Sequence, residues 1–196
     1  MPKKIIVTQY ISLDGVIEDP VGMENSGLGN WTGPFSRGPE GDQFKHDELM
    51  RADSLIFGRT TYAAFAAAWP YVKDETGYAS RINSLPKIVV SSTLEGPNWG
   101  PTDVWSGDIV AAAKAYRETG EGVALIFGSA SIARQLAPAG LIDEYRLMVY
   151  PTILGAGKRL FAAGDKRPLS LAECRQLGGG IVLLRYVPAS YDSRDS

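Results

Sequence analysis

Three apolar runs of this chain end in glycine and hydroxyl residues of the kind that binds phosphate. After the run that ends at Phe57, the chain continues with Gly58, Arg59, Thr60 and Thr61. Glycine at such a point lets the backbone approach a ligand, and a helix that starts there offers free N–H groups. The guanidinium of Arg59 can add two hydrogen bonds to one phosphate. This first joint therefore indicates an anion site.

A second joint follows the continuous apolar run Val123–Phe127, which is typical of a strand covered on both faces. Gly128 and Ser129 come next, and a short helix is predicted to begin at once, with Ser129 or Ser131 as its cap. A phosphate-binding turn and an ordinary strand–turn–helix connection both account for this segment. The segment alone does not separate the two interpretations.

A third apolar run, from Lys87 to Ser91, ends in the hydroxyls of Ser91, Ser92 and Thr93. These hydroxyls could bind a ribose phosphate or close a turn by bonding to nearby backbone groups. Ligands of open α/β sheets bind beyond the carboxyl ends of the strands, so the three joints are expected to meet at one edge of a sheet. Together they suggest a nucleotide that carries several phosphates.

The first strand leads into a fourth candidate element, Asp14 followed by Gly15. This dipeptide most often means a turn. A functional interpretation places the Asp14 carboxylate at the mouth of the same cleft, where burial and a nearby cofactor would raise its pKa. Asp14 is then the candidate to deliver a proton or to hold N–H groups of a substrate.

Strand and helix patterns alternate along the chain, which is typical of an α/β domain. A glycine-rich polar loop, 14–41, contains Trp31 and Phe35 and is interpreted as a lid over the cleft. The three glycines from Gly178 to Gly180 predict a hairpin turn between the last two strands. The expected strands are 3–10, 54–57, 87–91, 123–127, 145–153, 170–177 and 181–187, and the expected helices are 42–51, 60–69 and 108–118.

Composition excludes several classes of function. The 196 residues, 44% of them hydrophobic, suit one domain over 1–188 with a polar tail over 189–196. The net charge of -2 and the lack of a basic stripe argue against nucleic acid, and no apolar run is long enough to span a membrane. A lone cysteine, Cys174, and no signal-peptide pattern lead us to expect a cytoplasmic protein. Cys174 and the single histidine, His46, form no metal-ligand cluster, and His46 is expected on the surface.

The ordered set of motifs SLDGVI, IFGRTTY, KIVVSSTL, LIFGSASIARQL and GLIDEYRLMVYPTILGAGKRLF covers nearly the whole chain. It resembles the dihydrofolate reductase superfamily, and more closely the branch of the reductase domain of bacterial riboflavin biosynthesis. The resemblance implies a three-layer α/β fold, with a mostly parallel central sheet and a C-terminal antiparallel hairpin.

The resemblance also implies that NADPH is the cofactor. The residues that match the family's cofactor-binding segments lie at the three joints. They are Gly58, Arg59, Thr60, Thr61, Ser91, Ser92, Gly128, Ser129 and Ala130. Two departures stand out. Gly128 is followed by a serine where folate reductases carry a second glycine, and the acidic residue on the helix after the mobile loop has no clear match, although Asp47 and Glu48 are nearby in sequence.

These features lead us to expect a reductase that transfers a hydride from NADPH to a C=N or C=O bond of a small heterocycle, pterin-like or pyrimidine-like. Its substrate pocket is expected to be walled by apolar side chains of the first strand and the loop, namely Ile11, Leu13, Val16 and Trp31. The strand 145–153 is expected to support a homodimer. Two alternatives remain open: a non-catalytic dinucleotide-binding protein of the same fold, and an interaction module in which the glycines only tighten turns.

Overall fold

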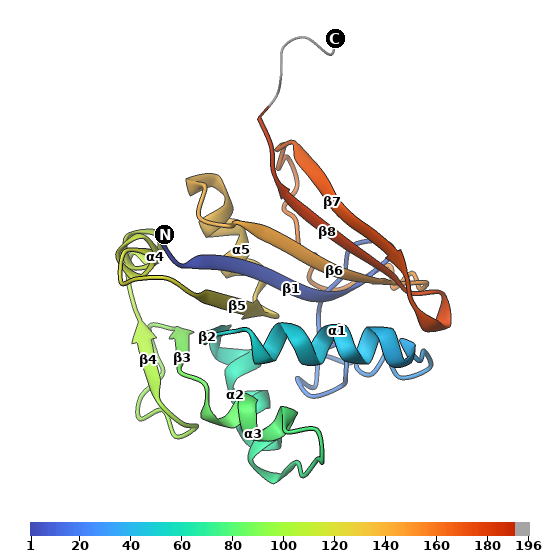
Figure 1. The fold of residues 1–196 in the computed structure, drawn as a ribbon, viewed down its shortest axis with the longest axis horizontal. Coiled ribbons are helices and arrows are strands. Elements are labelled where there is room, and N and C mark those ends of the chain that lie inside the picture. Colours follow the sequence, from blue (N-terminus) through green and yellow to red (C-terminus); the bar gives the residue numbers. More distant parts are fainter. Residues whose placement is uncertain (191–196) are drawn as a thin grey trace.

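A single twisted sheet of eight strands forms the centre of the protein (Figure 1). The computed structural model describes residues 1–190. The strand order is β4-β3-β2-β5-β1-β6-β8-β7, and all neighbours pair in parallel except β6 with β8 and β8 with β7. The strands are β1 (Lys4–Ser12), β2 (Ser54–Gly58), β3 (Lys87–Val90), β4 (Thr102–Trp105), β5 (Val123–Phe127), β6 (Glu144–Tyr150), β7 (Leu169–Gln176) and β8 (Val182–Pro188).

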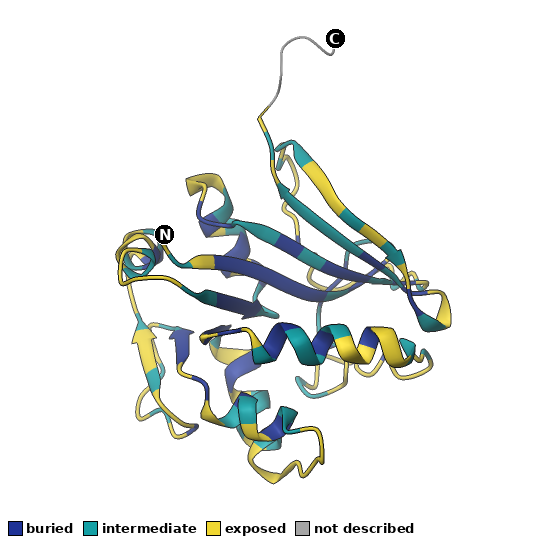
Figure 2. Cartoon of the chain, in the orientation of Figure 1, coloured by how far each residue is buried: buried dark blue, intermediate teal, exposed yellow. Residues whose placement is uncertain are grey.

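The central strands are apolar because both of their faces are covered. Figure 2 shows the central strands β1 and β5 as largely buried, and their register pairs Ile6 with Leu125. Side chains that alternate along these strands enter two separate hydrophobic clusters. One cluster includes Val7 and Ile126, and the other includes Ile6 and Leu125.

The first three helices pack on one face of the sheet, and the last two pack on the other. The helices are α1 (Gly38–Met50), α2 (Arg59–Ala68), α3 (Tyr78–Ser84), α4 (Ile109–Arg117) and α5 (Ala130–Leu136). Leu49 of α1, Tyr62 of α2 and Ile82 of α3 pack in the cluster with Ile6. The buried residues of α4 and α5 pack in the cluster with Val7. The three-layer α/β architecture expected from the sequence is thus confirmed, as is the C-terminal antiparallel hairpin.

Several element boundaries differ from expectation for local reasons. The first long helix begins at Gly38, not at residue 42, because Pro39 is compatible with a first helical turn. The strand expected over 145–153 ends at Tyr150, since Pro151 cannot continue the ladder. The short helix α3 and the edge strand β4 were not predicted. β4 has only four residues, too few to show the alternation of a strand.

The loop between β1 and α1 is a folded segment with its own core. The buried Asp19 carboxylate accepts hydrogen bonds from the backbone N–H of Glu24 and from both the N–H and the hydroxyl of Ser26. The indole N–H of Trp31 donates to the carbonyl of Glu18, and its ring packs edge-on against Tyr150 with centroids 5.6 Å apart. The interactions of this loop therefore hold it against β6.

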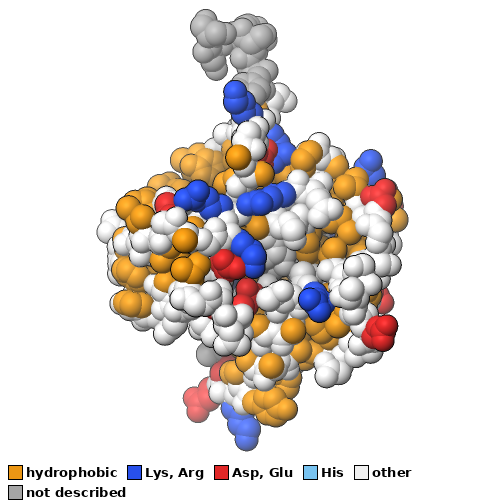
Figure 3. Space-filling model, turned by 180° about the vertical axis from the view of Figure 1, so that it is seen from behind, with side chains coloured by type: hydrophobic (Ala, Val, Ile, Leu, Met, Phe, Trp, Pro, Cys, Tyr) orange, Lys and Arg blue, Asp and Glu red, His pale blue; other side chains and the backbone are white. Residues whose placement is uncertain are grey.

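Three observations bear on nucleic-acid binding, membrane insertion and metal binding. Figure 3 shows a face on which basic and acidic side chains are interspersed with apolar ones, with no continuous basic surface. The described part of the chain contains no helix that is long and apolar enough to cross a membrane. Likewise, no group of three or more potential metal ligands occurs within residues 1–190. Most of the expected polar tail, residues 191–196, lies outside the described residues.

Candidate active site

One large cavity opens at the carboxyl ends of β1, β2 and β5. Its volume is about 1390 Å³. Pockets for single drug-sized ligands usually measure about 300–1,000 Å³, so this one has room for a large ligand and a second, smaller one. The joints at Gly58 and Gly128 line one part of the cavity, and side chains of α1 line another. Two of the three predicted joints are therefore brought together in one place.

The first joint, at the end of β2, presents the start of α2 to the cavity. Gly58 has extended backbone angles (φ -77°, ψ 161°), and α2 begins at Arg59. The positive end of a helix dipole and its free N–H groups thus face the cavity beside Gly58. Arg59 is exposed on the cavity wall, and no hydrogen bond or ion pair involves its guanidinium within residues 1–190. This cation is available to an anionic ligand.

The second joint adopts a backbone conformation that the sequence left in doubt. Gly128 (φ 58°) and Ser129 (φ 59°) are both left-handed, so the serine takes the place of a second glycine at the usual cost of roughly 1–2 kcal/mol for a side chain in this region. The Ser129 hydroxyl accepts a hydrogen bond from the backbone N–H of Gly58 at 2.6 Å. This bond offsets the strain and fastens the second joint to the first.

Contacts from β1 and α2 complete the fit around Gly128. The side-chain amide of Gln9 donates to the carbonyl of Gly128 at 2.6 Å. A Cβ atom added to Gly128 would lie 2.5 Å from the hydroxyl oxygen of Thr61, which leaves no room for a side chain. Ser129 stands at the N-cap position of α5, as expected from the sequence, but its hydroxyl makes no capping hydrogen bond and instead ties two strand ends together.

The joints at Gly58 and Gly128 together are called the double joint here. The loop between β1 and α1 contacts it through the acidic residue Glu24. The Thr61 hydroxyl donates a hydrogen bond to the Glu24 carboxylate at 2.7 Å. Both residues line the cavity, so a carboxylate lies at the start of α2, where the helix dipole favours negative charge.

The third predicted joint lies outside the cavity wall. Its strand contributes Val90 to the lining, but Ser91 and Ser92 do not line the cavity. The Ser91 hydroxyl accepts hydrogen bonds from the backbone N–H groups of Thr93 and Leu94, which is the turn-closing alternative. Contact of Ser91 or Ser92 with a bound phosphate remains a prediction.

Asp14 does not have the environment expected of a proton donor. It does not line the cavity. The Ser12 hydroxyl donates to its carboxylate, as do the backbone N–H groups of Leu154 and Gly155, and these bonds lower the pKa of Asp14 to about 2. The expectation of a raised pKa was wrong, because hydrogen bonds to the ionised form outweigh desolvation. Asp14 holds the segment after β6 against the end of β1.

The predicted substrate-pocket walls were also wrong. None of Ile11, Leu13, Val16 and Trp31 lines the cavity. Leu13 is exposed to solvent, whereas the other three are buried in the protein interior. The neighbouring Ile17 does line the cavity. Ile11 packs in the hydrophobic cluster that contains Val7, and Trp31 packs in the cluster that contains Tyr150.

Sequence reasoning missed a group of aromatic side chains, here called the aromatic wall, that lines the cavity next to the joints at Gly58 and Gly128. Phe65 and Trp69 from the end of α2 and its extension, Tyr78 from α3, and Phe127 from β5 line the cavity as a connected group. The Trp69 and Tyr78 rings lie 5.4 Å apart. Phe65 and Trp69 are four residues apart at the end of α2, but Tyr78 and Phe127 come from other segments, so the spacing of residues in the sequence does not reveal the whole wall.

A donor-rich region adjoins the aromatic wall. Arg37 donates to the Tyr10 hydroxyl at 2.5 Å and to the carboxylate of Asp42 at 2.6 Å. Burial raises the pKa of Tyr10 to about 12, so its hydroxyl stays protonated and can donate. His46, expected to be a solvated surface residue, instead lines the cavity, and Lys45 beside it is buried.

Replacing Gly128 with alanine tests the close fit at the second joint. We expect Gly128→Ala to lower the free energy of unfolding by about 1–3 kcal/mol, because the methyl group meets Thr61 and alanine is strained at positive φ. Gly140→Ala is the matched control, since Gly140 is also left-handed (φ 67°) but has open space around its Cβ position. Urea unfolding measures both variants, and equal losses would contradict the proposed clash.

The anchoring role of Asp14 predicts a pH-dependent effect. Its folded-state pKa lies below the unfolded value, so its contribution is complete above about pH 4 and is lost as pH falls toward about 2. We therefore expect Asp14→Asn to be less stable than the parent at neutral pH, with the difference shrinking on acidification. Urea midpoints across this range, with Asp103→Asn as an exposed control, check this. A difference independent of pH would refute it.

The chain is similar to known proteins in both sequence and structure. The chain is 28% identical over 193 residues to the uncharacterized protein YwjB of Bacillus subtilis (strain 168), covering 96% of this chain and 100% of the relative. A putative riboflavin biosynthesis protein from Shewanella sp. PV-4 has a similar structure (TM-score 0.69, 23% identity), with coverage of 97% of this chain and 100% of that one.

Dihydrofolate reductase from Enterococcus faecalis has the same fold at lower similarity, with a TM-score of 0.56 and 14% identity over 95% of this chain and 97% of that one. The family model of the RibD C-terminal domain matches residues 3–183. The chain therefore belongs to the family of the RibD C-terminal domain.

Proposed function

We propose that this protein is an NADPH-dependent reductase that acts on a C=N or C=O bond of a small heterocycle, pterin-like or pyrimidine-like. The observation that carries the proposal is the double joint of Gly58 and Gly128 at one wall of a cavity of about 1390 Å³. The family is one of reductases, and the fold is that of dihydrofolate reductase.

The residues at the double joint fit a dinucleotide. Gly128 lines the cavity, and the exposed Arg59 guanidinium has no partner among the described residues. The residues that would hold NADPH are Gly58, Arg59, Thr60, Thr61, Gly128, Ser129 and Ala130, all of which line the cavity. When bound, the reduced nicotinamide supplies a hydride. The contribution of the protein is to bind, to orient and to exclude water.

The aromatic wall and the donor-rich region suit the substrate. A flat heterocycle would stack against Trp69 and Tyr78, and the phenol of Tyr10 would donate to a carbonyl or ring nitrogen. These side chains replace the wrongly predicted pocket walls. A protein that binds NADPH but reduces no substrate would instead support the alternative of a non-catalytic dinucleotide-binding protein.

Cofactor titration is the direct test. We expect saturable quenching of tryptophan emission by NADPH, since Trp69 lines the cavity, and weaker binding of NADH. Arg59→Ala should weaken NADPH binding about tenfold and leave NADH unchanged, because only NADPH carries the 2′-phosphate and a charge-assisted hydrogen bond contributes about 1.5–3 kcal/mol. Arg51→Ala, at the exposed end of α1, is the control. If the wild-type protein binds neither nucleotide, the proposal fails.

The Glu24 carboxylate at the start of α2 makes a second prediction. A phosphate bound near Thr61 would face this negative charge, so Glu24→Gln should bind NADPH more tightly, by a factor of about three to ten. Glu121→Gln, a distant exposed carboxylate, should have no effect. The same titration measures both variants, and weaker binding by Glu24→Gln would show that the carboxylate helps to hold the cofactor.

A further inference from the structure

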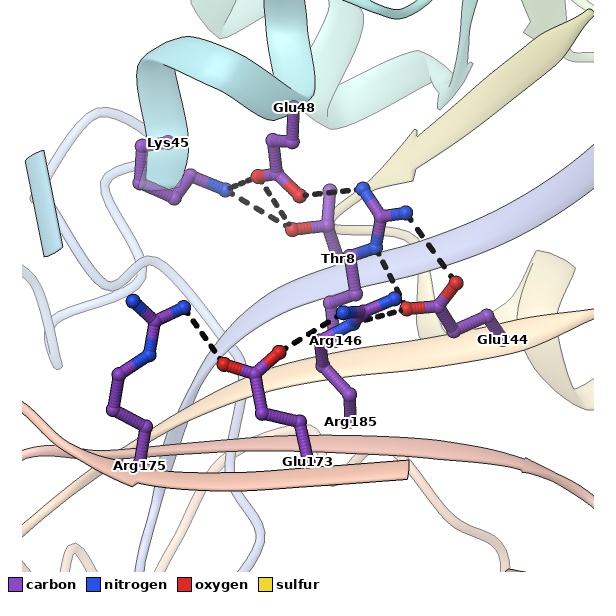
Figure 4. Close-up of polar contacts among 8 residues, drawn as sticks. All are labelled: Thr8, Lys45, Glu48, Glu144, Arg146, Glu173, Arg175 and Arg185. Carbon is purple, nitrogen blue, oxygen red and sulfur yellow. Dashed lines mark hydrogen bonds and ion pairs between the residues drawn. The ribbon is translucent and has the colours of Figure 1, made fainter. Parts of the chain in front are cut away.

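A chain of alternating charges runs from the cavity to the edge of the sheet (Figure 4). It begins with Lys45 and Glu48 on α1, continues through Arg146 and Glu144 on β6, and reaches Arg185 on β8. Glu173 and Arg175 on β7 complete it. Four cations alternate with three anions, so each carboxylate lies between two positive groups. The cavity end of this chain is Lys45.

Lys45 is buried, with 5% of its surface exposed, yet it lines the cavity. Its ammonium group donates to the hydroxyl of Thr8 at 3.0 Å and forms a short contact with the carboxylate of Glu48. The rings of Tyr10 and Phe127 lie 5.3 Å and 5.0 Å from the nitrogen. A lysine ammonium has three donors, and only two have partners within residues 1–190. The third is available to a ligand.

Glu48 and Thr8 fix the position of this ammonium. The Thr8 hydroxyl also donates to Glu48 at 2.9 Å, so the three side chains form a closed triangle. The second oxygen of Glu48 lies 3.6 Å from the guanidinium of Arg146. Arg146 in turn donates twice to Glu144, at 2.9 Å and 3.3 Å. The lysine is thus held from behind by a network that extends away from the cavity.

The other ionisable groups near the aromatic wall are less suited to supply a proton. Arg37 stays protonated at any ordinary pH and is paired with Asp42. The Nε2 atom of His46 lies 3.2 Å from the carbonyl of Thr76, and Asp14 lies outside the cavity. Burial lowers the pKa of Lys45, and Glu48 acts against this, while Arg37 and Arg146 add to the lowering. A neutral amine at this position is accordingly easier to form than on an exposed lysine.

We propose that Lys45 is the catalytic proton donor of the cavity, with Glu48 and Thr8 as positioning residues. This inference rests on the proposed reductase function. In the step, an N–H bond of the Lys45 ammonium breaks and an N–H or O–H bond forms on the heteroatom of the reduced double bond. The carbon of that bond receives the hydride that the nicotinamide cofactor supplies. Lys45 is left as a neutral amine and regains a proton from water in the open cavity.

Access to Lys45 is measured by reductive methylation with formaldehyde and cyanoborohydride, read by peptide mass. Lys87 is the matched control, because it is equally buried but donates to the carbonyls of Asn83 and Leu85 and does not line the cavity. Burial lowers the pKa of Lys87 to about 8, so slow labelling of Lys87 would reflect lack of access. We expect Lys45 to be labelled at least tenfold faster. Labelling no faster than that of Lys87 would overturn the proposal.

Turnover of Lys45 variants separates a proton donor from a mere positive charge. The probes are dihydrofolate, dihydrobiopterin and a ribosylaminouracil, followed by loss of NADPH absorbance. We expect Lys45→Met to bind NADPH within about twofold of wild type but to reduce the probe at least 100-fold more slowly, the usual lower range for general acid catalysis. Lys45→Arg should be equally slow, since arginine keeps the charge but cannot release a proton. Lys73→Met, on the surface, should be unaffected.

Different results would contradict the reductase proposal and the Lys45 inference. The reductase proposal fails if wild-type protein does not bind NADPH. The Lys45 inference fails in protein that does bind NADPH, if Lys45→Met keeps wild-type turnover or if Lys45→Arg restores it. Circular dichroism of each variant at the assay temperature confirms that a slow variant is folded.

Discussion

The hydrogen bond from the Gly58 N–H to the Ser129 hydroxyl is the interaction on which the candidate site depends. It joins the ends of β2 and β5, which are neighbours in the sheet but 71 residues apart along the chain. Through it, the start of α2 and the left-handed turn at Gly128 share one wall. A glycine in place of Ser129 would relieve backbone strain but would leave the Gly58 N–H without this partner. Ser129 therefore adds backbone strain but also supplies a hydrogen-bond partner for the Gly58 N–H. For this reason the turn does not require a second glycine.

At the end of the cavity where Lys45 lies, the constraint is the cost of burying charged side chains. A lysine and a glutamate removed from water are each costly, and their mutual attraction offsets the cost only when further hydrogen bonds satisfy both groups. Here Thr8 hydrogen-bonds to both groups, and Arg146 adds an ion pair to the second oxygen of Glu48 at 3.6 Å. Arg146 is itself held by two hydrogen bonds to Glu144.

The sequence predicted the fold well because its strongest signals are local and periodic. The buried run Val123–Phe127 matched its strand at both ends, and the helix expected over 108–118 is found as α4, with the Asp108 carboxylate as its N-cap. The place of Gly58 and Gly128 at the ends of their strands was also predictable, because glycine after an apolar strand is a local signal. Asp14 and Trp31 were misjudged, since their environment depends on how a long loop folds back, which no local pattern encodes. Lys45 and the aromatic wall were missed for the same reason: their partners come from segments far apart in the chain.

Long-range assembly of the cavity wall has a thermodynamic consequence. Gln9, Gly58, Thr61 and Gly128 meet only when β1, β2 and β5 are paired, so no partly unfolded form that separates these strands can retain the wall. A ligand that binds there stabilises the native state alone, and by linkage raises the global free energy of unfolding, by about 2.7 kcal/mol at a hundred times its Kd. Occupancy of this wall is thus coupled to the integrity of the whole sheet rather than to the order of a single loop.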